Sequence, residues 1–189
     1  LPEASQPNVF LCSPYVRARQ TLERVVAAMG LDASVIVQDE RLREREFGIF
    51  DGLTRLGVED RYPDQARALT TIGKFYHRPP GGESWCDVIL RLRSVVEVLR
   101  RDHVGDRVLI VAHQVIVNCF RYLLECMDEA EVLEHDRQAD VPNCGVTEYG
   151  LDRARADARF ELKIANHVVP PLADSAPVTT APDQPTGPK

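Results

Sequence analysis

The sequence lacks a long hydrophobic run and lacks an excess of positive charge. Its apolar stretches are far shorter than the roughly 20 residues that a membrane-spanning helix needs. The formal net charge is −6 at pH 7, and a negative surface repels phosphate backbones. No secretory signal pattern stands at the start of the chain. We therefore expect no nucleic-acid partner, no membrane association and a cytoplasmic location.

Disulfide and metal patterns are also missing. The five cysteines contain no C-x-x-C pair, and their odd number disfavours a closed disulfide framework, which leaves free thiols in a reducing cytosol. Four of the five histidines share no ligand spacing with cysteines or acidic residues. We expect no metal and no cofactor. The cysteines are Cys12, Cys86, Cys119, Cys126 and Cys144, and the four histidines are His77, His103, His135 and His167.

What the chain does have is enough apolar surface for one core. Hydrophobic residues make up 44% of its 189 residues, a length typical of a single domain. From residue 170 onward the composition shifts to Pro, Ala, Thr, Ser and Asp, which cannot bury enough surface to become ordered. The sequence therefore predicts one domain over residues 1–169 and a disordered tail over 170–189.

Hydrophobic periodicity predicts strands that alternate with amphipathic helices. Ser13 and Pro14 are suited to begin the first helix, and Ser84 with Asp87 resembles a capping box. Residues 38–82 are irregular, with short helical pieces. This alternation predicts an α/β fold with a mostly parallel sheet flanked by helices. The expected strands are 9–12, 35–37, 108–112, 145–149 and 160–165, and the expected helices are 14–29, 84–104 and 115–126.

Polar side chains follow two of the buried strands. Arg17 lies in the first turn of the helix after strand 9–12, and His113 lies between strand 108–112 and a helix. In an open α/β sheet, ligands bind beyond the carboxyl ends of the strands, and helix N-termini attract anions. Taken singly, each residue is more often a solvated arginine or a core histidine. Together, at the ends of two strands, they favour an oxyanion pocket.

Four ordered segments carry a family resemblance. Residues 13–21 are similar to an S-P-x-x-R-A-x-Q-T motif, and residues 42–54 to a glutamate segment with spaced glycines. Residues 80–84 contain a G-G-E-S turn, and residues 111–113 end in a histidine after a strand. Over residues 9–166 the chain resembles the histidine phosphatase superfamily, whose members are phosphoglycerate-mutase-like. The resemblance implies a three-layer α/β sandwich.

The resemblance also implies roles for individual residues. Arg17 and His113 would bind the phosphoryl group, with the N–H of Gln114 as a further donor. Glu44 would be the general acid and then the base, without any metal. Spacing alone does not separate Glu44 from Glu46, but the glycine offset of the family pattern selects Glu44. Glu83 would line the substrate side, or it belongs only to a helix-start turn.

One family feature is missing from the chain. The family opens with a strand that ends in Arg-His-Gly, and its histidine attacks phosphorus to form a phosphohistidine. No Arg-His-Gly triplet occurs in the 189 residues, and the chain begins at Leu1. We therefore expect that the first strand is missing, that the intact parent is longer, and that this chain alone is inactive.

The family branch and the reaction remain expectations. Gln114 after His113, together with the Gly-Glu-Ser turn, is similar to the fructose-2,6-bisphosphatase branch. The short interval over residues 49–80 favours a phosphatase over a phosphoglycerate mutase. We expect hydrolysis of a small phosphorylated metabolite. A mutase and a non-catalytic phosphate-binding pseudo-enzyme remain alternatives, and a homodimer stays open.

Overall fold

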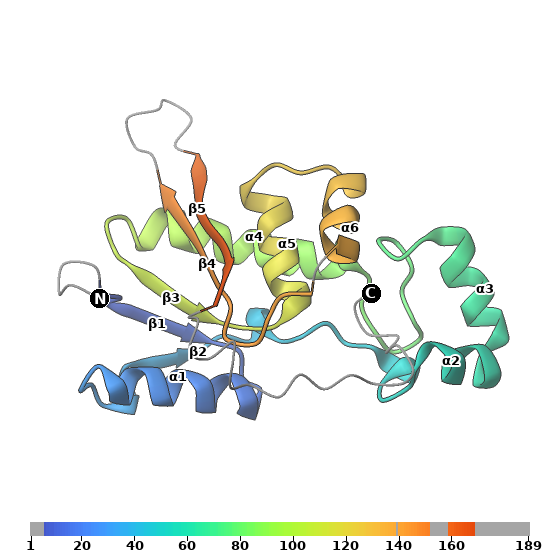
Figure 1. Ribbon diagram of the computed structural model, residues 1–189, viewed down its shortest axis with the longest axis horizontal. Helices are drawn as coiled ribbons and strands as arrows, with labels where there is room; N and C mark the ends of the chain where they lie inside the picture. Colours follow the sequence, from blue (N-terminus) through green and yellow to red (C-terminus); the bar gives the residue numbers. More distant parts are fainter. Residues whose placement is uncertain (1–5, 139, 152–158, 169–189) are drawn as a thin grey trace.

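The computed structural model describes residues 6–138, 140–151 and 159–168 (Figure 1). The expected tail over 170–189 lies outside the described residues. The strands are β1 (Val9–Cys12), β2 (Ile36–Gln38), β3 (Val108–Val111), β4 (Val146–Leu151) and β5 (Phe160–His167). The α-helices are α1 (Val16–Ala28), α2 (Arg55–Arg61), α3 (Pro63–Ile72), α4 (Trp85–Asp102), α5 (Gln114–Leu124) and α6 (Glu129–Gln138). Three short 3-10 turns are η2 (Ala33–Val35), η3 (Glu40–Leu42) and η4 (Gly48–Phe50).

A parallel sheet of three strands forms the centre of the fold. β1 lies between β2 and β3 and is parallel to both. Phe10 of β1 is opposite Ile36 on one side and Leu109 on the other. β4 and β5 form a separate antiparallel pair. The prediction of an α/β fold with a mostly parallel sheet is confirmed.

Alternation along the strands builds two hydrophobic layers. Phe10 and Cys12 pack with Leu22 and Val26 of α1, on one face of the sheet. Leu11, between them in sequence, packs on the other face with the core of α4 and α5. Figure 1 shows α1 below the sheet, with α4 and α5 above it. The three layers are therefore α1, the sheet, and the pair α4 and α5.

Helix starts test the capping predictions directly. Ser84 accepts from the backbone of Asp87, and the Asp87 carboxylate accepts from the Ser84 N–H, so the capping box is confirmed. The prediction for Ser13 and Pro14 is wrong. The helix begins at Val16 with Tyr15 as its N-cap, and Ser13 is fully buried.

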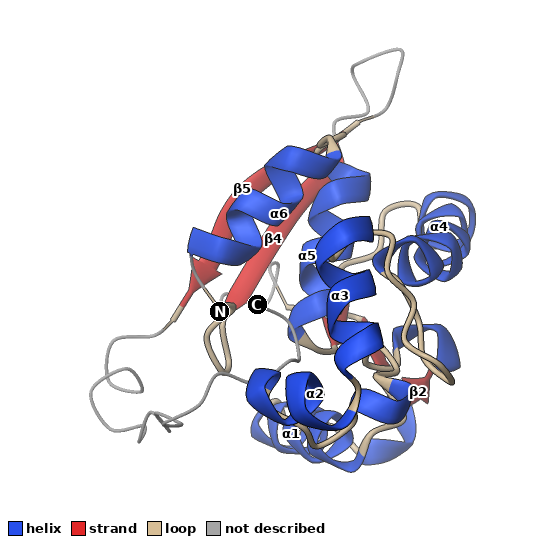
Figure 2. Cartoon of the chain, turned by 90° about the vertical axis from the view of Figure 1, so that its right-hand side faces the viewer, coloured by secondary structure: helices blue, strands red, loops and turns tan. Residues whose placement is uncertain are grey.

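Two regions of the fold were only partly visible in the sequence. Within residues 38–82, α2 and α3 form a helical pair at one end of the molecule (Figures 1 and 2). Helix α6 was not predicted, because half of its ten residues are charged and its apolar stripe is reduced to Val132 and the partly buried Leu133. It packs against α5, on the side of α5 that faces away from the β4–β5 pair (Figure 1).

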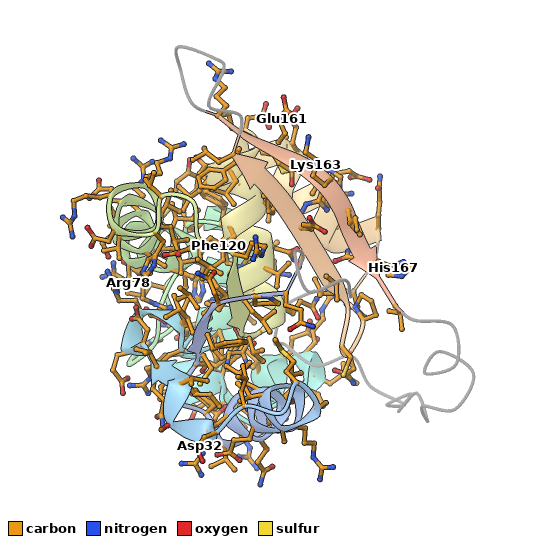
Figure 3. The ribbon with its side chains drawn as sticks, turned by 90° about the vertical axis from the view of Figure 1, so that its left-hand side faces the viewer. Asp32, Arg78, Phe120, Glu161, Lys163 and His167 are labelled. Carbon is orange, nitrogen blue, oxygen red and sulfur yellow. The ribbon has the colours of Figure 1, made fainter. Side chains whose placement is uncertain are left out.

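A polar and an apolar side chain point in opposite directions at two positions on β5 and α5. Lys163 projects from β5 on the outside of the molecule, whereas Phe120 of α5 points toward the interior (Figure 3). In the part of the chain that the structure describes, no helix combines the length and the apolar character that a bilayer crossing requires.

Candidate active site

The carboxyl ends of the three parallel strands meet at one edge of the sheet. Beyond β1 the chain leads to Arg17, beyond β2 to Glu44 and beyond β3 to His113. The ends are joined by backbone hydrogen bonds: Ser13 N–H donates to Val111 O at 3.0 Å, and Asp39 N–H donates to Cys12 O at 2.9 Å. The topology therefore brings three ionisable side chains from distant segments to one place.

The three side chains are close together. Arg17 Nη2 lies 3.0 Å from His113 Nδ1, and the same ring nitrogen lies 4.0 Å from Glu44 Oε2. The Tyr15 and His113 rings meet edge-to-face, with 5.1 Å between their centres. The Cζ of Arg17 lies 4.7 Å from the centre of the Tyr15 ring. Arg17 is exposed to solvent while His113 is buried, so the group is open to solvent on the arginine side.

The hydrogen bonds of His113 define its protonation. The Arg17 guanidinium has donors only, so His113 Nδ1 accepts and carries no proton. The proton is then on Nε2, which donates to Ser13 Oγ at 2.7 Å. Burial lowers the pKa of His113 to about 4, and the charges of Arg17 and Arg91 act in the same direction. His113 is therefore a neutral hydrogen-bonding group near pH 7.

Burial favours the protonated form of Glu44. Burial raises the pKa of its carboxyl above the usual range, against the hydrogen bond from the Arg45 N–H and the charges of Arg17, Arg91 and Arg45. Glu44 Oε1 accepts from Arg45 N–H at 2.9 Å, and its side chain is 14% exposed. A raised carboxyl pKa keeps more of the acid form near neutral pH, which suits proton transfer to a leaving group.

The neighbouring acid Glu46 lies in a different environment. Glu46 Oε1 accepts from Arg43 Nη2 at 2.5 Å and from the Tyr15 hydroxyl at 3.5 Å. Its side chain is 42% exposed, and no pairing with His113 is recorded for it among the described residues. The geometry favours Glu44 over Glu46 as the acid that faces the histidine.

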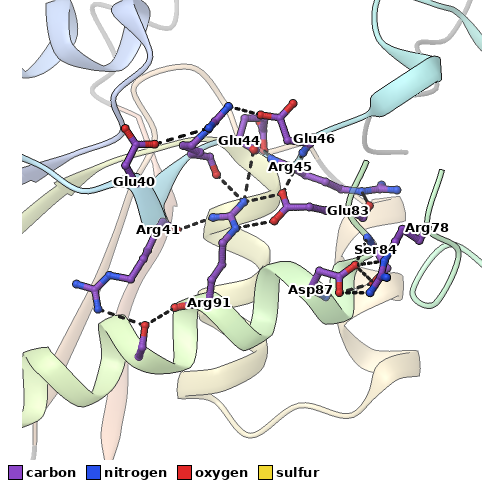
Figure 4. A network of polar contacts seen from close by, with 12 residues as sticks. Glu40, Arg41, Glu44, Arg45, Glu46, Arg78, Glu83, Ser84, Asp87 and Arg91 are labelled. Atoms are coloured by element: carbon purple, nitrogen blue, oxygen red, sulfur yellow. Dashed lines mark hydrogen bonds and ion pairs between the residues drawn. The ribbon is translucent and has the colours of Figure 1, made fainter. Parts of the chain in front are cut away.

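Glu83 and Gln114 are placed beside this group. Glu83 turns its carboxylate to Arg91, with Oε1 2.9 Å from Nε, and its Oε2 accepts from the Glu46 N–H at 3.0 Å (Figure 4). This pairing favours a role for Glu83 in holding Arg91 and the backbone of Glu46 in place over direct contact with substrate. Gln114 is the first residue of α5, and its Nε2 donates to Asp140 Oδ1 at 3.1 Å.

Sequence reasoning missed a buried charged layer next to Glu44. Arg45 is only 5% exposed, and its Nε donates to the Glu83 carbonyl at 2.7 Å. Lys74 forms an ion pair with Asp136, whose other oxygen accepts from Asn118 Nδ2 at 3.1 Å. The polar residue Asn118 within an otherwise apolar helix was the feature of the sequence that could have pointed to this charged layer. Across residues 6–138, 140–151 and 159–168, no group of three or more side chains has metal-ligand character.

Comparison with known proteins identifies relatives of this chain. Residues 3–161 match the histidine phosphatase superfamily, branch 1. The chain is 31% identical over 137 residues to a 2,3-bisphosphoglycerate-dependent phosphoglycerate mutase of Methylobacterium radiotolerans, covering 71% of this chain and 64% of the relative. It is 36% identical over 108 residues to a Caenorhabditis elegans 6-phosphofructo-2-kinase/fructose-2,6-bisphosphatase, and the match covers 57% of this chain and 22% of that relative.

Solved structures show the same fold. A mycobacterial glucosyl-3-phosphoglycerate phosphatase with inorganic phosphate superposes with a TM-score of 0.68 at 25% identity, over 87% of this chain and 79% of that one. The chain spans less than two thirds of the lengths of the mutase and the bifunctional enzyme. The match over residues 3–161, with the shared α/β fold, makes this chain a member of the histidine phosphatase superfamily, branch 1.

Proposed function

We propose that this chain supplies the phosphate-binding and proton-transfer groups of a metal-independent phosphatase that acts on small phosphomonoesters. The observation that carries the proposal is the convergence of Arg17, His113 and Glu44 from the ends of three parallel strands. The relatives' names support the substrate class, because they refer to phosphoglycerate, fructose-2,6-bisphosphate and glucosyl-3-phosphoglycerate.

Each of the three residues has a role in this reaction. The Arg17 guanidinium binds two oxygens of the phosphoryl group, and the bound anion favours protonation of His113 Nδ1, which then donates to a phosphoryl oxygen. The nucleophilic histidine of the parent protein forms a bond to phosphorus while the phosphorus–oxygen bond of the ester breaks, and Glu44 gives its proton to the departing alkoxide oxygen. Glu44 then takes a proton from the water that cleaves the phosphohistidine, which restores the acid form and releases phosphate.

The nucleophilic histidine of this reaction is expected in an Arg-His-Gly triplet, which the 189 residues do not contain. We therefore propose that these residues bind phosphate without turning over a phosphate ester, and that the intact parent provides the nucleophile. A reading frame with Arg-His-Gly upstream would support a phosphatase. A natural start near Leu1 would support the rival proposal of a phosphate-binding pseudo-enzyme.

Phosphate binding tests the site directly. Titration calorimetry with inorganic phosphate should show one site, and Arg17→Met should weaken it roughly tenfold or more, because a charge-assisted hydrogen-bond pair is lost. Arg24→Met is the matched control, since Arg24 is an exposed arginine on the same helix. Equal binding by wild type and Arg17→Met would contradict the proposal. Hydrolysis of an aryl phosphate by the 189-residue chain would contradict its expected inactivity.

The reaction of the intact parent separates the phosphatase from the mutase. A protein that carries both these residues and the nucleophile should hydrolyse an aryl phosphate faster than it isomerises 3-phosphoglycerate. The relative from Methylobacterium radiotolerans supports the mutase as the second candidate. Isomerisation that exceeds hydrolysis would reverse the order of the two proposals.

A further inference from the structure

One arginine outside the group of three organises the backbone around Glu44. Arg91 lies on α4, and its side chain is 18% exposed. Its Nη1 donates to the Arg41 carbonyl at 2.5 Å, and its Nη2 donates to the Arg43 carbonyl at 2.8 Å and the Glu44 carbonyl at 3.4 Å. A single guanidinium therefore binds three carbonyls within four consecutive residues (Figure 4).

The backbone of this segment needs such support. η3 ends at Leu42, and η4 begins at Gly48, so Glu44 lies in a stretch without helix or strand hydrogen bonds of its own. A backbone segment of this kind opens more readily than a packed helix or strand. The position of the Glu44 carboxyl then depends on whatever binds the surrounding carbonyls.

Glu83 anchors the arginine and the segment together. Both of its carboxylate oxygens pair with Arg91, at 2.9 Å from Nε and 3.1 Å from Nη2. Glu83 Oε2 also accepts from the Glu46 N–H at 3.0 Å, and the Glu83 N–H donates to the Glu46 carbonyl at 2.8 Å. The pair is mostly shielded from water, which makes its hydrogen bonds stronger than those of a surface pair.

The chemistry of the contact requires arginine. The guanidinium presents five donors in a rigid plane, and here that plane meets three carbonyls and one carboxylate. Lysine would keep the positive charge but could not reach the same acceptors at the same time. Charge and geometry can therefore be separated by substitution.

We propose that Arg91, anchored by Glu83, is a positioning residue that holds the Glu44 carboxyl beside His113. This inference rests on the proposed role of Glu44 in proton transfer. A general acid loses effect when it is displaced by a fraction of an ångström, so a fixed backbone is part of the chemistry. Arg91 itself contacts no part of the Arg17–His113 pair by a hydrogen bond recorded among the described residues.

The test compares Arg91→Met and Arg91→Lys with the control Arg93→Met, an exposed arginine on the same helix. Amide exchange at Arg45 and Glu46 should accelerate roughly tenfold in both Arg91 variants and remain unchanged in the control. Carbon-13 titration in the 189-residue chain should show a higher pKa of Glu44 in Arg91→Met than in wild type, because a positive charge is lost. In Arg91→Lys the pKa of Glu44 should lie between the values of Arg91→Met and wild type.

A second variant keeps the test decisive if Arg91→Met does not fold. Glu83→Gln retains an acceptor oxygen but removes the charge, so it should accelerate the same exchange by a smaller factor. The proposal would be overturned if Arg91→Lys showed the same amide exchange and the same Glu44 titration as wild type. It would also be overturned if Arg93→Met changed them as much as Arg91→Met does. These measurements use no phosphate, so a failure to bind phosphate would refute the proposed function without deciding the role of Arg91.

Discussion

Arg17 and His113 share a hydrogen bond that a bound anion would have to replace. Arg17 Nη2 lies 3.0 Å from His113 Nδ1, and the ring nitrogen accepts because the guanidinium can only donate. A phosphoryl oxygen between the two groups would accept from Arg17 and would need a donor on the ring. The contact with Arg17 therefore stabilises the neutral histidine, and an anion would favour its protonation.

The first prediction concerns the pH dependence of stability. The pKa of His113 is about 4 in the folded chain and near 6.5 when unfolded, so the unfolded chain binds more protons between these values. The free energy of unfolding should fall as the pH is lowered from about 6.5 to about 4, by this contribution. His113→Gln should remove this part of the pH dependence. Denaturant unfolding at several pH values measures both, and an unchanged slope in His113→Gln would contradict the assignment.

The second prediction isolates the effect of Arg17 on the histidine. Burial is the larger cause of the low pKa of His113, and the Arg17 charge adds to it. Arg17→Met should therefore raise the pKa of His113 without restoring its ordinary value. Nitrogen-15 spectra of the ring give this pKa and also report which nitrogen carries the proton. The Arg24→Met control should titrate like wild type.

The third prediction concerns Ser13, which is fully buried and accepts the Nε2–H of His113 at 2.7 Å. Ser13→Ala would leave that donor without its acceptor, at a cost of about 1–3 kcal/mol in the free energy of unfolding. Thr70→Ala is the control, because its hydroxyl bonds an exposed helix carbonyl and its loss should cost less. Denaturant unfolding of both variants checks the prediction, and equal losses would argue against the buried bond.

The sequence predicted the parts of the fold and site that depend on local pattern. Strand 9–12 has the expected bounds, since a short apolar run before Ser13 is unambiguous. The strand-to-helix order also placed Arg17 and His113 at one edge of the sheet. The roles of Ser13 and Arg91 were missed, because they depend on contacts across 100 and about 50 residues of sequence.

The fourth prediction tests the close approach of the two loops beside Glu44. Gly48 has φ of +55°, and a Cβ there would lie 2.2 Å from the Pro80 carbonyl oxygen. Gly52 has a similar φ of +68° with nothing within 4 Å. Gly52→Ala should cost about 1 kcal/mol in the free energy of unfolding from backbone strain alone, and Gly48→Ala should cost clearly more. Similar losses in the two variants would show that the loops separate without cost.

The last prediction concerns the buried ion pair of Lys74 and Asp136. The Asp136 side chain is 1% exposed and that of Lys74 18%, and burial lowers the pKa of Lys74 against the attraction of Asp136. Asp136→Ala would leave a largely buried ammonium and the Asn118 amide without their acceptor, which should cost about 3–5 kcal/mol in the free energy of unfolding.

The double variant Lys74→Met with Asp136→Leu removes both charges at once, so it distinguishes the net contribution of the ion pair from the cost of leaving one buried charge without its partner. Replacing both partners with apolar side chains leaves no uncompensated charge, so it should cost less than Asp136→Ala alone. Urea unfolding of the single and double variants measures the difference. A double variant that is less stable than the single one would show that the ion pair contributes net stability. That result would add this charged layer to the apolar contacts of Val132 and Leu133 that hold α6 against α5.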